Sequence, residues 1–227
     1  MHEERDLLRR TVRDLAGVEL SASHLDRLQA FLDELSLWNR RMNLTGLQSR
    51  ERIVVELIAD SLVPVPHLPP AATLLDVGSG AGLPGIPIKI VRPDIRVDLL
   101  EPSAKRTAFL RQAVRLLALS GVRVLRGRIE EDEVPLRHEG YDVVTARAVA
   151  GLEHVVRMCA GHVAHKGLLV GFGGKSAAIE LERARDSLAE AGLHLEDSVA
   201  YRPPGTPGER RTLLFRKAPT SEEAPGR

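Results

Sequence analysis

The sequence predicts an α/β protein: an open, mostly parallel sheet that begins near residue 70, follows a helical extension and ends in an antiparallel hairpin. Three observations support this. A glycine-rich turn follows the apolar run at residues 73–77, strand-like and helix-like segments then alternate as far as residue 191, and two strand-like segments close the pattern without room for a helix between them. Such alternation is typical of crossover units in a parallel sheet.

Length and composition limit the possibilities. The 227 residues suffice for one sizeable α/β domain with an appended segment. A single cysteine excludes a disulfide framework and fits a reducing compartment, and no apolar run is long enough to span a membrane. We therefore expect a cytoplasmic protein with a helical extension at 1–70, a main domain at 71–217 and a disordered tail at 218–227.

The first 70 residues are predicted to form three helices. Residues 3–16 are amphipathic, Ser23 is the expected N-cap of a longer helix with leucines at heptad spacing, and Ser49 starts the third helix. Prolines from Pro64 to Pro70 end that helix and mark the boundary with the sheet.

The end of the second helix carries the only tryptophan, Trp38, together with Asn39 and Asn43. These polar groups could contact a base or a cofactor, or they could cap the end of the helix. The sequence leaves both interpretations open.

The glycine-rich turn is the most informative stretch. Four glycines fall within residues 78–85, between the end of a strand and the start of a helix. Glycine permits positive φ and close approach of the backbone to a ligand, and the first N–H groups of the helix favour an electron-rich partner. The turn is therefore expected to bind a ligand.

Two classes of cofactor fit this turn. The spacing GxGxxG at 80–85 matches dinucleotide sites, and DxGxGxG at 76–82 matches S-adenosylmethionine sites. Glu101, at the end of the next strand, could accept hydrogen bonds from the ribose diol of either cofactor. Asp76 favours S-adenosylmethionine, because that cofactor has a cationic end and a pyrophosphate would be repelled.

Charge is unevenly distributed although the net charge is only +1. Residues 103–128 contain no acidic side chain and seven basic ones: Lys105, Arg106, Arg111, Arg115, Arg123, Arg126 and Arg128. Ser103 is predicted to cap a helix with Lys105 and Arg106 in its first turn, where the helix dipole disfavours cations. This block could dock a polyanionic substrate, or it could be a solvated arginine-rich surface.

The remaining elements continue the alternation. Residues 127–131 lie where they could contact an adenine ring, and Arg147 follows a strand at the sheet edge where ligands bind. The expected strands are 122–125, 141–145, 168–172, 193–201 and 211–217, and the expected helices are 152–163 and 176–191.

Four stretches are more specific than a generic glycine turn: DVGSGAGLPGIP at 76–87, KRxxFL at 105–110, RIE at 128–130 and ARA at 146–148. With WNxxxNLT at 38–45, they resemble the RsmG (GidB) family of small-subunit ribosomal RNA guanine-N7 methyltransferases. The resemblance extends from about residue 25 to residue 217 and is most specific in the GLPGIP run.

The resemblance implies a bacterial cytoplasmic enzyme, expected to be monomeric, that uses S-adenosylmethionine to methylate N7 of one guanine in 16S ribosomal RNA, free or in the small subunit. It implies a class I, Rossmann-like methyltransferase sheet. Together with the glycine turn, it assigns the cofactor to Gly78, Gly80, Gly82, Leu83, Glu101, Ile129, Glu130 and Arg147. The expected RNA contacts are Lys105, Arg106, Arg128 and Asn43.

Two positions depart from the family pattern. Glu56-Leu57 stands where members often have Arg-His, and Gly173-Gly174-Lys175 stands where they often have Lys-Gly. An RNA contact from the third helix and the role of Lys175 are therefore open.

The chemistry that the resemblance implies needs no general base, because N7 of guanine carries a free lone pair at neutral pH. Catalysis would rest on geometry, with Arg147 and Arg128 as positioning residues. No metal site is expected, since the histidines near residue 160 lack acidic companions. The alternatives are a methyltransferase acting on a small molecule, an RNA-binding scaffold without turnover, and a nicotinamide oxidoreductase.

Overall fold

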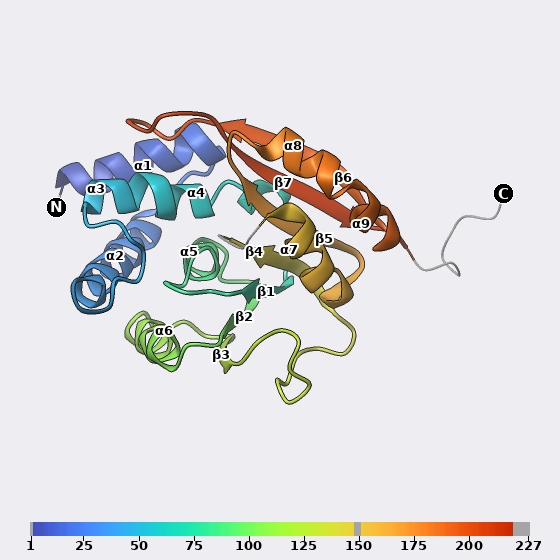
Figure 1. The fold of residues 1–227 in the computed structure, drawn as a ribbon. Coiled ribbons are helices and arrows are strands. Elements are labelled where there is room, and N and C mark those ends of the chain that lie inside the picture. Colours follow the sequence, from blue (N-terminus) through green and yellow to red (C-terminus); the bar gives the residue numbers. More distant parts are fainter. Residues whose placement is uncertain (1, 148–150, 220–227) are drawn as a thin grey trace.

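The computed structural model describes residues 2–147 and 151–219 (Figure 1). The described residues form a seven-stranded sheet of order β3-β2-β1-β4-β5-β7-β6, parallel except for β7, which runs antiparallel to β5 and β6. The strands are β1 (Thr73–Val77), β2 (Arg96–Glu101), β3 (Val122–Arg126), β4 (Tyr141–Ala146), β5 (Val163–Gly173), β6 (Leu193–Tyr201) and β7 (Arg210–Lys217). The predicted parallel sheet with a terminal antiparallel hairpin is confirmed.

Some helices come before the first strand in the sequence, and the others connect the strands. They are α1 (His2–Ala16), α2 (Ala22–Met42), α3 (Arg50–Ile53), a π-helix (Val54–Ile58), α4 (Ala59–Ser61), a 3₁₀ turn (Val65–His67), α5 (Gly85–Val91), α6 (Ala104–Leu116), α7 (Leu152–Cys159), a 3₁₀ turn (Ala160–His162), α8 (Ala177–Arg183) and α9 (Arg185–Glu190). Among the described residues, none of these helices combines the length and hydropathy needed to cross a membrane.

Several predicted boundaries were wrong. The N-cap of α2 is Ser21, whose Oγ accepts from the His24 backbone N–H at 3.1 Å, so Ser23 lies inside the helix. The helix predicted from Ser49 is capped there, but it continues as a π-helix before α4. β5 begins at Val163, which shortens the preceding helix, and the helix predicted at 176–191 breaks at Ala184. These shifts leave the order of elements unchanged.

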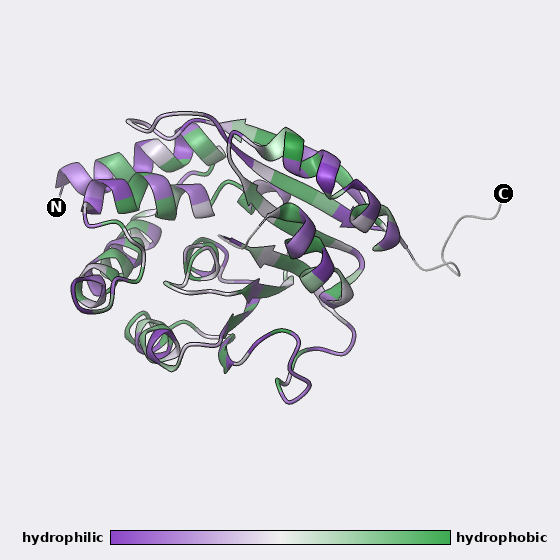
Figure 2. Cartoon of the chain, viewed as in Figure 1, coloured by the Kyte–Doolittle hydropathy of each residue, from purple (hydrophilic) through white to green (hydrophobic). Residues whose placement is uncertain are grey.

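Alternating residues of the central strands face opposite sides of the sheet, as the strand period of two requires. Leu74 and Val143 join a core formed with α1, α2, α5 and α6, whereas Leu75 and Val144 join a core formed with α7 and α9. Figure 2 shows the apolar residues concentrated on these inner strands, with polar residues along the outer surfaces of the N-terminal helices.

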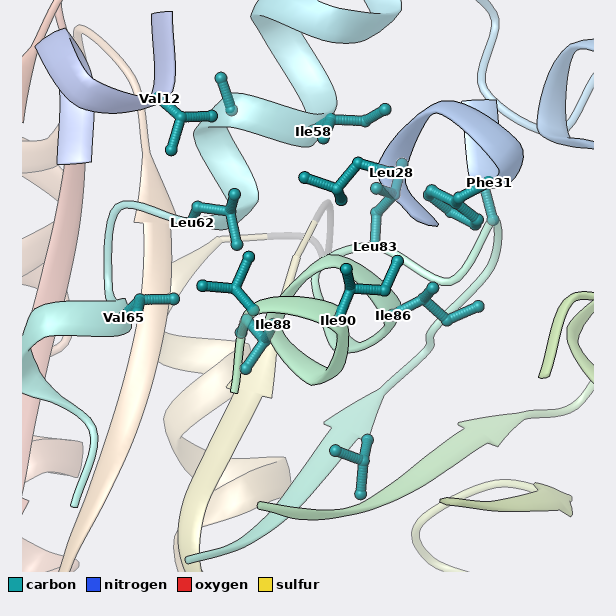
Figure 3. Packing of buried hydrophobic residues seen from close by; sticks show 14 of the residues in the cluster. Val12, Leu28, Phe31, Ile58, Leu62, Val65, Leu83, Ile86, Ile88 and Ile90 are labelled. Carbon is teal, nitrogen blue, oxygen red and sulfur yellow. The ribbon is translucent and has the colours of Figure 1, made fainter. Parts of the chain in front are cut away.

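The N-terminal helices share a core with the sheet domain. In Figure 3, Ile86 and Ile90 of α5 point toward Leu28 and Phe31 of α2, and all four side chains are buried. The division at residue 70 stays a prediction about folding units. Most of the expected tail, residues 220–227, lies outside the described residues.

Candidate active site

The glycine turn lies at the carboxyl end of β1, where the strand order changes direction between β1 and β4. Ligands of open α/β sheets bind at such a switch point. The φ values of Gly78, Gly80 and Gly82 are 69°, 53° and 77°, which residues other than glycine rarely adopt. Ser79 fixes the turn to the neighbouring strand, because its backbone N–H donates to the Leu100 carbonyl at 3.0 Å.

Asp76 supports the turn from beneath. Its side chain is fully buried and accepts hydrogen bonds from Thr145 Oγ1 at 2.9 Å and from the Gly85 backbone N–H at 3.1 Å. Burial raises its pKa to about 6. The carboxylate has no exposed surface and accepts from the backbone at the start of α5, so its preference for a cofactor with a cationic end stays a prediction.

Glu101 links the turn to the start of α6. One carboxylate oxygen accepts from the Gly80 N–H and the other from the Ser103 N–H, each at 2.9 Å. The residue is 2% exposed. Glu101 therefore orders the turn, and its contact with a ribose stays a prediction.

A pocket of about 220 Å³ opens beside the turn. Its walls come from the ends of β1 and β2, the loop after β3 and one face of α7: Val77, Gly78, Leu100, Pro102, Gly127, Arg128, Ile129, Glu130, His154 and Met158. Apolar side chains with a few polar groups at the rim suit a flat, mostly uncharged ring system such as adenine. No heavy atom lies within 4 Å of the point where a Cβ on Gly78 would stand, so the backbone there is open to a ligand.

Three predicted cofactor residues, Gly78, Ile129 and Glu130, line this pocket, and so does the predicted RNA contact Arg128. Sequence reasoning missed His154 and Met158. Their spacing of four places both on one face of α7, but only the docking of that helix shows which face meets the pocket.

Other predicted cofactor residues lie elsewhere. Leu83 is buried and packs against α2 near Leu28 (Figure 3). A Cβ on Gly82 would stand 2.5 Å from Ile86 Cδ1, so this glycine serves the packing of the turn against α5.

Arg147 points away from the pocket. Its Nη2 lies 2.7 Å from Asp60 Oδ2 and donates to the Glu56 carbonyl at 2.8 Å, while its guanidinium stacks on the Phe172 ring at 5.5 Å. The side chain is 15% exposed. Any direct role of Arg147 toward cofactor or base stays a prediction.

Three of the predicted RNA contacts lie on or beside two neighbouring helices, α2 and α6. Lys105 and Arg106 are exposed in the first turn of α6, and Asn43 is exposed in the left-handed C-cap of α2. Trp38 packs on Phe109 with ring centroids 5.7 Å apart, which brings the end of α2 beside α6.

Two residues of the predicted surface have structural roles instead. Asn39 is buried, and its side chain accepts from the Thr45 N–H at 3.0 Å and donates to the Leu47 carbonyl at 2.5 Å, so it orders the turn after α2. Arg123 pairs with Asp98 and therefore does not belong to the group at α6.

Comparison with known proteins agrees with this geometry. The sequence profile of the family described as rRNA small subunit methyltransferase G matches residues 24–202. A protein named ribosomal RNA small subunit methyltransferase G from Geobacter sp. (strain M21) is 36% identical over 213 residues, covering 92% of this chain and 95% of that protein. Its namesake from Acetivibrio thermocellus is 35% identical over 209 residues, covering 90% and 86%.

A Neisseria meningitidis serogroup C protein of the same name is 44% identical over 151 residues, or 66% of this chain and 70% of that protein. Solved structures share the fold: a methyltransferase from Pyrococcus furiosus (TM-score 0.59, 16% identity, covering 84% of this chain and 98% of that one) and a SAM-dependent methyltransferase from Aquifex aeolicus (TM-score 0.57, 18% identity, covering 77% and 96%). With the fold of a SAM-dependent methyltransferase and relatives along nearly its whole length, this chain belongs to the rRNA small subunit methyltransferase G family.

Proposed function

We propose that this protein transfers the methyl group of S-adenosylmethionine to N7 of a guanine in 16S ribosomal RNA. The observation that carries the proposal is the position of the pocket. It opens at the switch point of the sheet, and its wall includes Pro102, which lies two residues before α6 and its exposed basic residues Lys105 and Arg106. A cofactor site beside a cationic surface suits transfer to a polyanion.

The adenosyl part of the cofactor would occupy the pocket between Gly78, Ile129 and Met158, with Glu130 at its rim. The methionine part would extend over the backbone of the glycine turn. When bound, the cofactor supplies an electrophilic methyl group on sulfonium, and the protein's task is to hold the nucleophile in line with it.

Three ionisable side chains near the site are not available as a general base or a covalent nucleophile. The carboxylates of Asp76 and Glu101 are buried and engaged by backbone N–H groups. Cys159 is buried, which raises the pKa of its thiol to about 12, so it supplies no thiolate for covalent catalysis at neutral pH. Guanine N7 can attack with its own lone pair, which is consistent with this set of groups.

The RNA surface would consist of the exposed residues Arg40, Arg41 and Asn43 at the end of α2 and Lys105 and Arg106 of α6. These side chains would contact phosphates and so determine affinity more than sequence choice. We further propose that the enzyme works as a monomer in the cytoplasm, where small ribosomal subunits are assembled.

The test of the reaction is methyl transfer from labelled S-adenosylmethionine to unmodified small subunits and to naked 16S RNA, followed by chemical cleavage at N7-methylguanosine. A single cleavage position is expected in one or both substrates. Labelling of neither, with cofactor binding intact, would contradict the proposal and favour a small-molecule substrate.

The test of the surface is RNA affinity as a function of salt. Removing both charges in Lys105→Gln/Arg106→Gln should reduce the slope of log affinity against log salt by about 1.5, since each phosphate contact contributes about 0.7–0.9. The matched control, Arg183→Gln/Arg185→Gln, removes two exposed charges from α8 and α9. Equal slopes for the two double variants would exclude α6 as the docking surface.

A further inference from the structure

One buried carboxylate, Asp60 of α4, joins three parts of the chain that are far apart in sequence. Its Oδ2 lies 2.7 Å from Arg147 Nη2 at the end of β4. Its Oδ1 accepts from the Tyr201 hydroxyl at 2.7 Å and from Arg210 Nη1 at 3.2 Å, so both strands of the terminal hairpin reach the same group. Asp60 is 2% exposed.

The N-terminal segment surrounds the Arg147 guanidinium. Nη1 donates to the Leu57 carbonyl and to Ser61 Oγ, each at 3.2 Å, and Nη2 donates to the Glu56 carbonyl at 2.8 Å. Both carbonyls belong to the π-helix, a distortion that is frequent at functional sites. Five of the contacts that hold this side chain, including Phe172, therefore come from outside its own strand.

The side chains that contact Asp60 balance its negative charge. Burial and the carboxylate raise the pKa of Tyr201 above its ordinary value, so the hydroxyl stays a neutral donor. Arg147 and Arg210 supply two positive charges, and Glu56 Oε2 pairs with Arg210 at 2.8 Å. Removing the charge of Asp60 would leave Arg147 without the anion that holds it.

The position of Arg147 gives this cluster a functional meaning. It directly follows Ala146, whose register partner in β1 is Val77, a wall residue of the cofactor pocket. The chain then enters α7, which supplies His154 and Met158 to the same pocket. Arg147 therefore stands at the sheet edge where a substrate must meet the cofactor.

We propose that Asp60 is a positioning residue for methyl transfer: it holds Arg147 in place after the carboxyl end of β4, at the edge of the site. The N-terminal helices and the terminal hairpin are then parts of the active site and not mere attachments to it. The inference rests on the proposed function for its kinetic consequence, whereas its structural consequence, that Asp60 holds Arg147, does not.

The kinetic test is a double-mutant cycle. Asp60→Asn keeps the shape and the Oδ1 acceptor but loses the ion pair with Arg147. We expect it to lower kcat about tenfold or more while the KM for S-adenosylmethionine changes less than about threefold. If Asp60 acts through Arg147, Arg147→Gln should cause a similar loss and the double variant no more than either alone. Losses that multiply would overturn the inference.

The matched control is Asp98→Asn in β2, a buried carboxylate that also has an arginine and a tyrosine as partners but lies outside the cluster. It disrupts the ion pair with Arg123 and keeps an acceptor for the Tyr141 hydroxyl. This control should lower the melting temperature. Its kcat, measured at a temperature below the melting temperatures of all variants, should stay within about twofold of the wild-type value. A tenfold kcat loss here would reduce the role of Asp60 to general stability.

The activity-independent test uses trypsin, which cleaves after arginine. In the native protein the Arg147 side chain is paired with Asp60 and is only 15% exposed. Asp60→Asn should be cut at the Arg147–Ala148 bond about tenfold faster or more, as followed by mass spectrometry, whereas Asp98→Asn should not. Equal rates in wild type and Asp60→Asn would refute the positioning contact.

These readouts separate the two proposals. If the wild type methylates no ribosomal RNA, the proposed function fails, and the protease experiment still decides whether Asp60 holds Arg147. If Asp60→Asn does not fold, Tyr201→Phe replaces it. This variant removes one hydrogen bond to Asp60 and should lower kcat about threefold with native circular dichroism. An unchanged kcat in that variant would count against the inference.

Discussion

Replacing Asp76 with asparagine should change how the stability of the fold depends on pH. The carboxyl group is fully buried at the end of β1, and burial raises its pKa from 3.8 to about 6 despite hydrogen bonds from Thr145 and Gly85. The folded protein therefore holds a proton on this group between pH 4 and 6, where the unfolded chain has released it.

Because the pKa of Asp76 is higher in the folded state, the ionised carboxylate opposes folding, and stability falls as pH rises through this interval. A difference between 3.8 and about 6 corresponds to about 3 kcal/mol when the group is fully ionised in both states. About 2 kcal/mol of this falls between pH 4.5 and 7.5.

The assay is urea unfolding of wild type and Asp76→Asn at pH 4.5, 6 and 7.5, followed by circular dichroism. Asparagine can accept from the Gly85 N–H and donate to Thr145 Oγ1, so it preserves the local contacts without titrating. The unfolding free energy of the variant minus that of wild type should rise by about 2 kcal/mol from pH 4.5 to 7.5.

Asp94→Asn serves as the control of opposite sign. A side-chain hydrogen bond from Arg92 holds the pKa of Asp94 well below its ordinary value. Its stabilising effect is present above pH 4 and lost below it, so this variant should differ from wild type by a constant amount over the same interval. A constant difference for Asp76→Asn as well would refute the assignment of a raised pKa to Asp76.

Three further outcomes are expected. Gly82→Ala should lower the unfolding free energy by about 3 kcal/mol in urea titrations, because φ is 77° and the new Cβ meets Ile86 Cδ1 at 2.5 Å. Gly205→Ala is the control: its φ is 70° but its Cβ would enter open space, so it should lower the unfolding free energy by about 1 kcal/mol. Gly78→Ala should be as stable as the Gly205 variant but bind S-adenosylmethionine about tenfold more weakly by calorimetry, since its methyl group enters the pocket; equal affinity would place the cofactor elsewhere. Cys159, buried and with its pKa raised to about 12, should resist iodoacetamide at pH 8 until urea unfolds the protein, and rapid native labelling would contradict its burial.

The local signals in the sequence were sufficient for the order of elements. Glycine spacing at 78–85 predicted a turn between strand and helix, and the short Pro/Gly-rich link after residue 201 predicted the antiparallel hairpin of β6 and β7. Both depend on backbone conformations that particular residues favour, which is information within a few neighbouring positions. The helix ends were predicted less accurately. Ser21 and Ser23 are both residues that can cap a helix, and the structure shows that Ser21 is the N-cap of α2.

The tertiary structure alone decided how the side chains are used. The glycine pattern drew attention to Asp76, but only the packing of α5 shows that its carboxylate is buried under the turn. Likewise the sequence predicted that Arg147 lies at the sheet edge where ligands bind, but only the fold shows that its side chain pairs with Asp60.

The sequence by itself determined the fold class, the glycine turn and the family, because these depend on local conformational preferences and on motif spacing. The tertiary structure decided which charges remain free for a substrate, because a charge is neutralised by whichever opposite charge the fold brings within a few ångströms. Arg123 and Lys105 belong to one basic stretch of the sequence. Only the fold pairs Arg123 with Asp98 and leaves Lys105 exposed on α6.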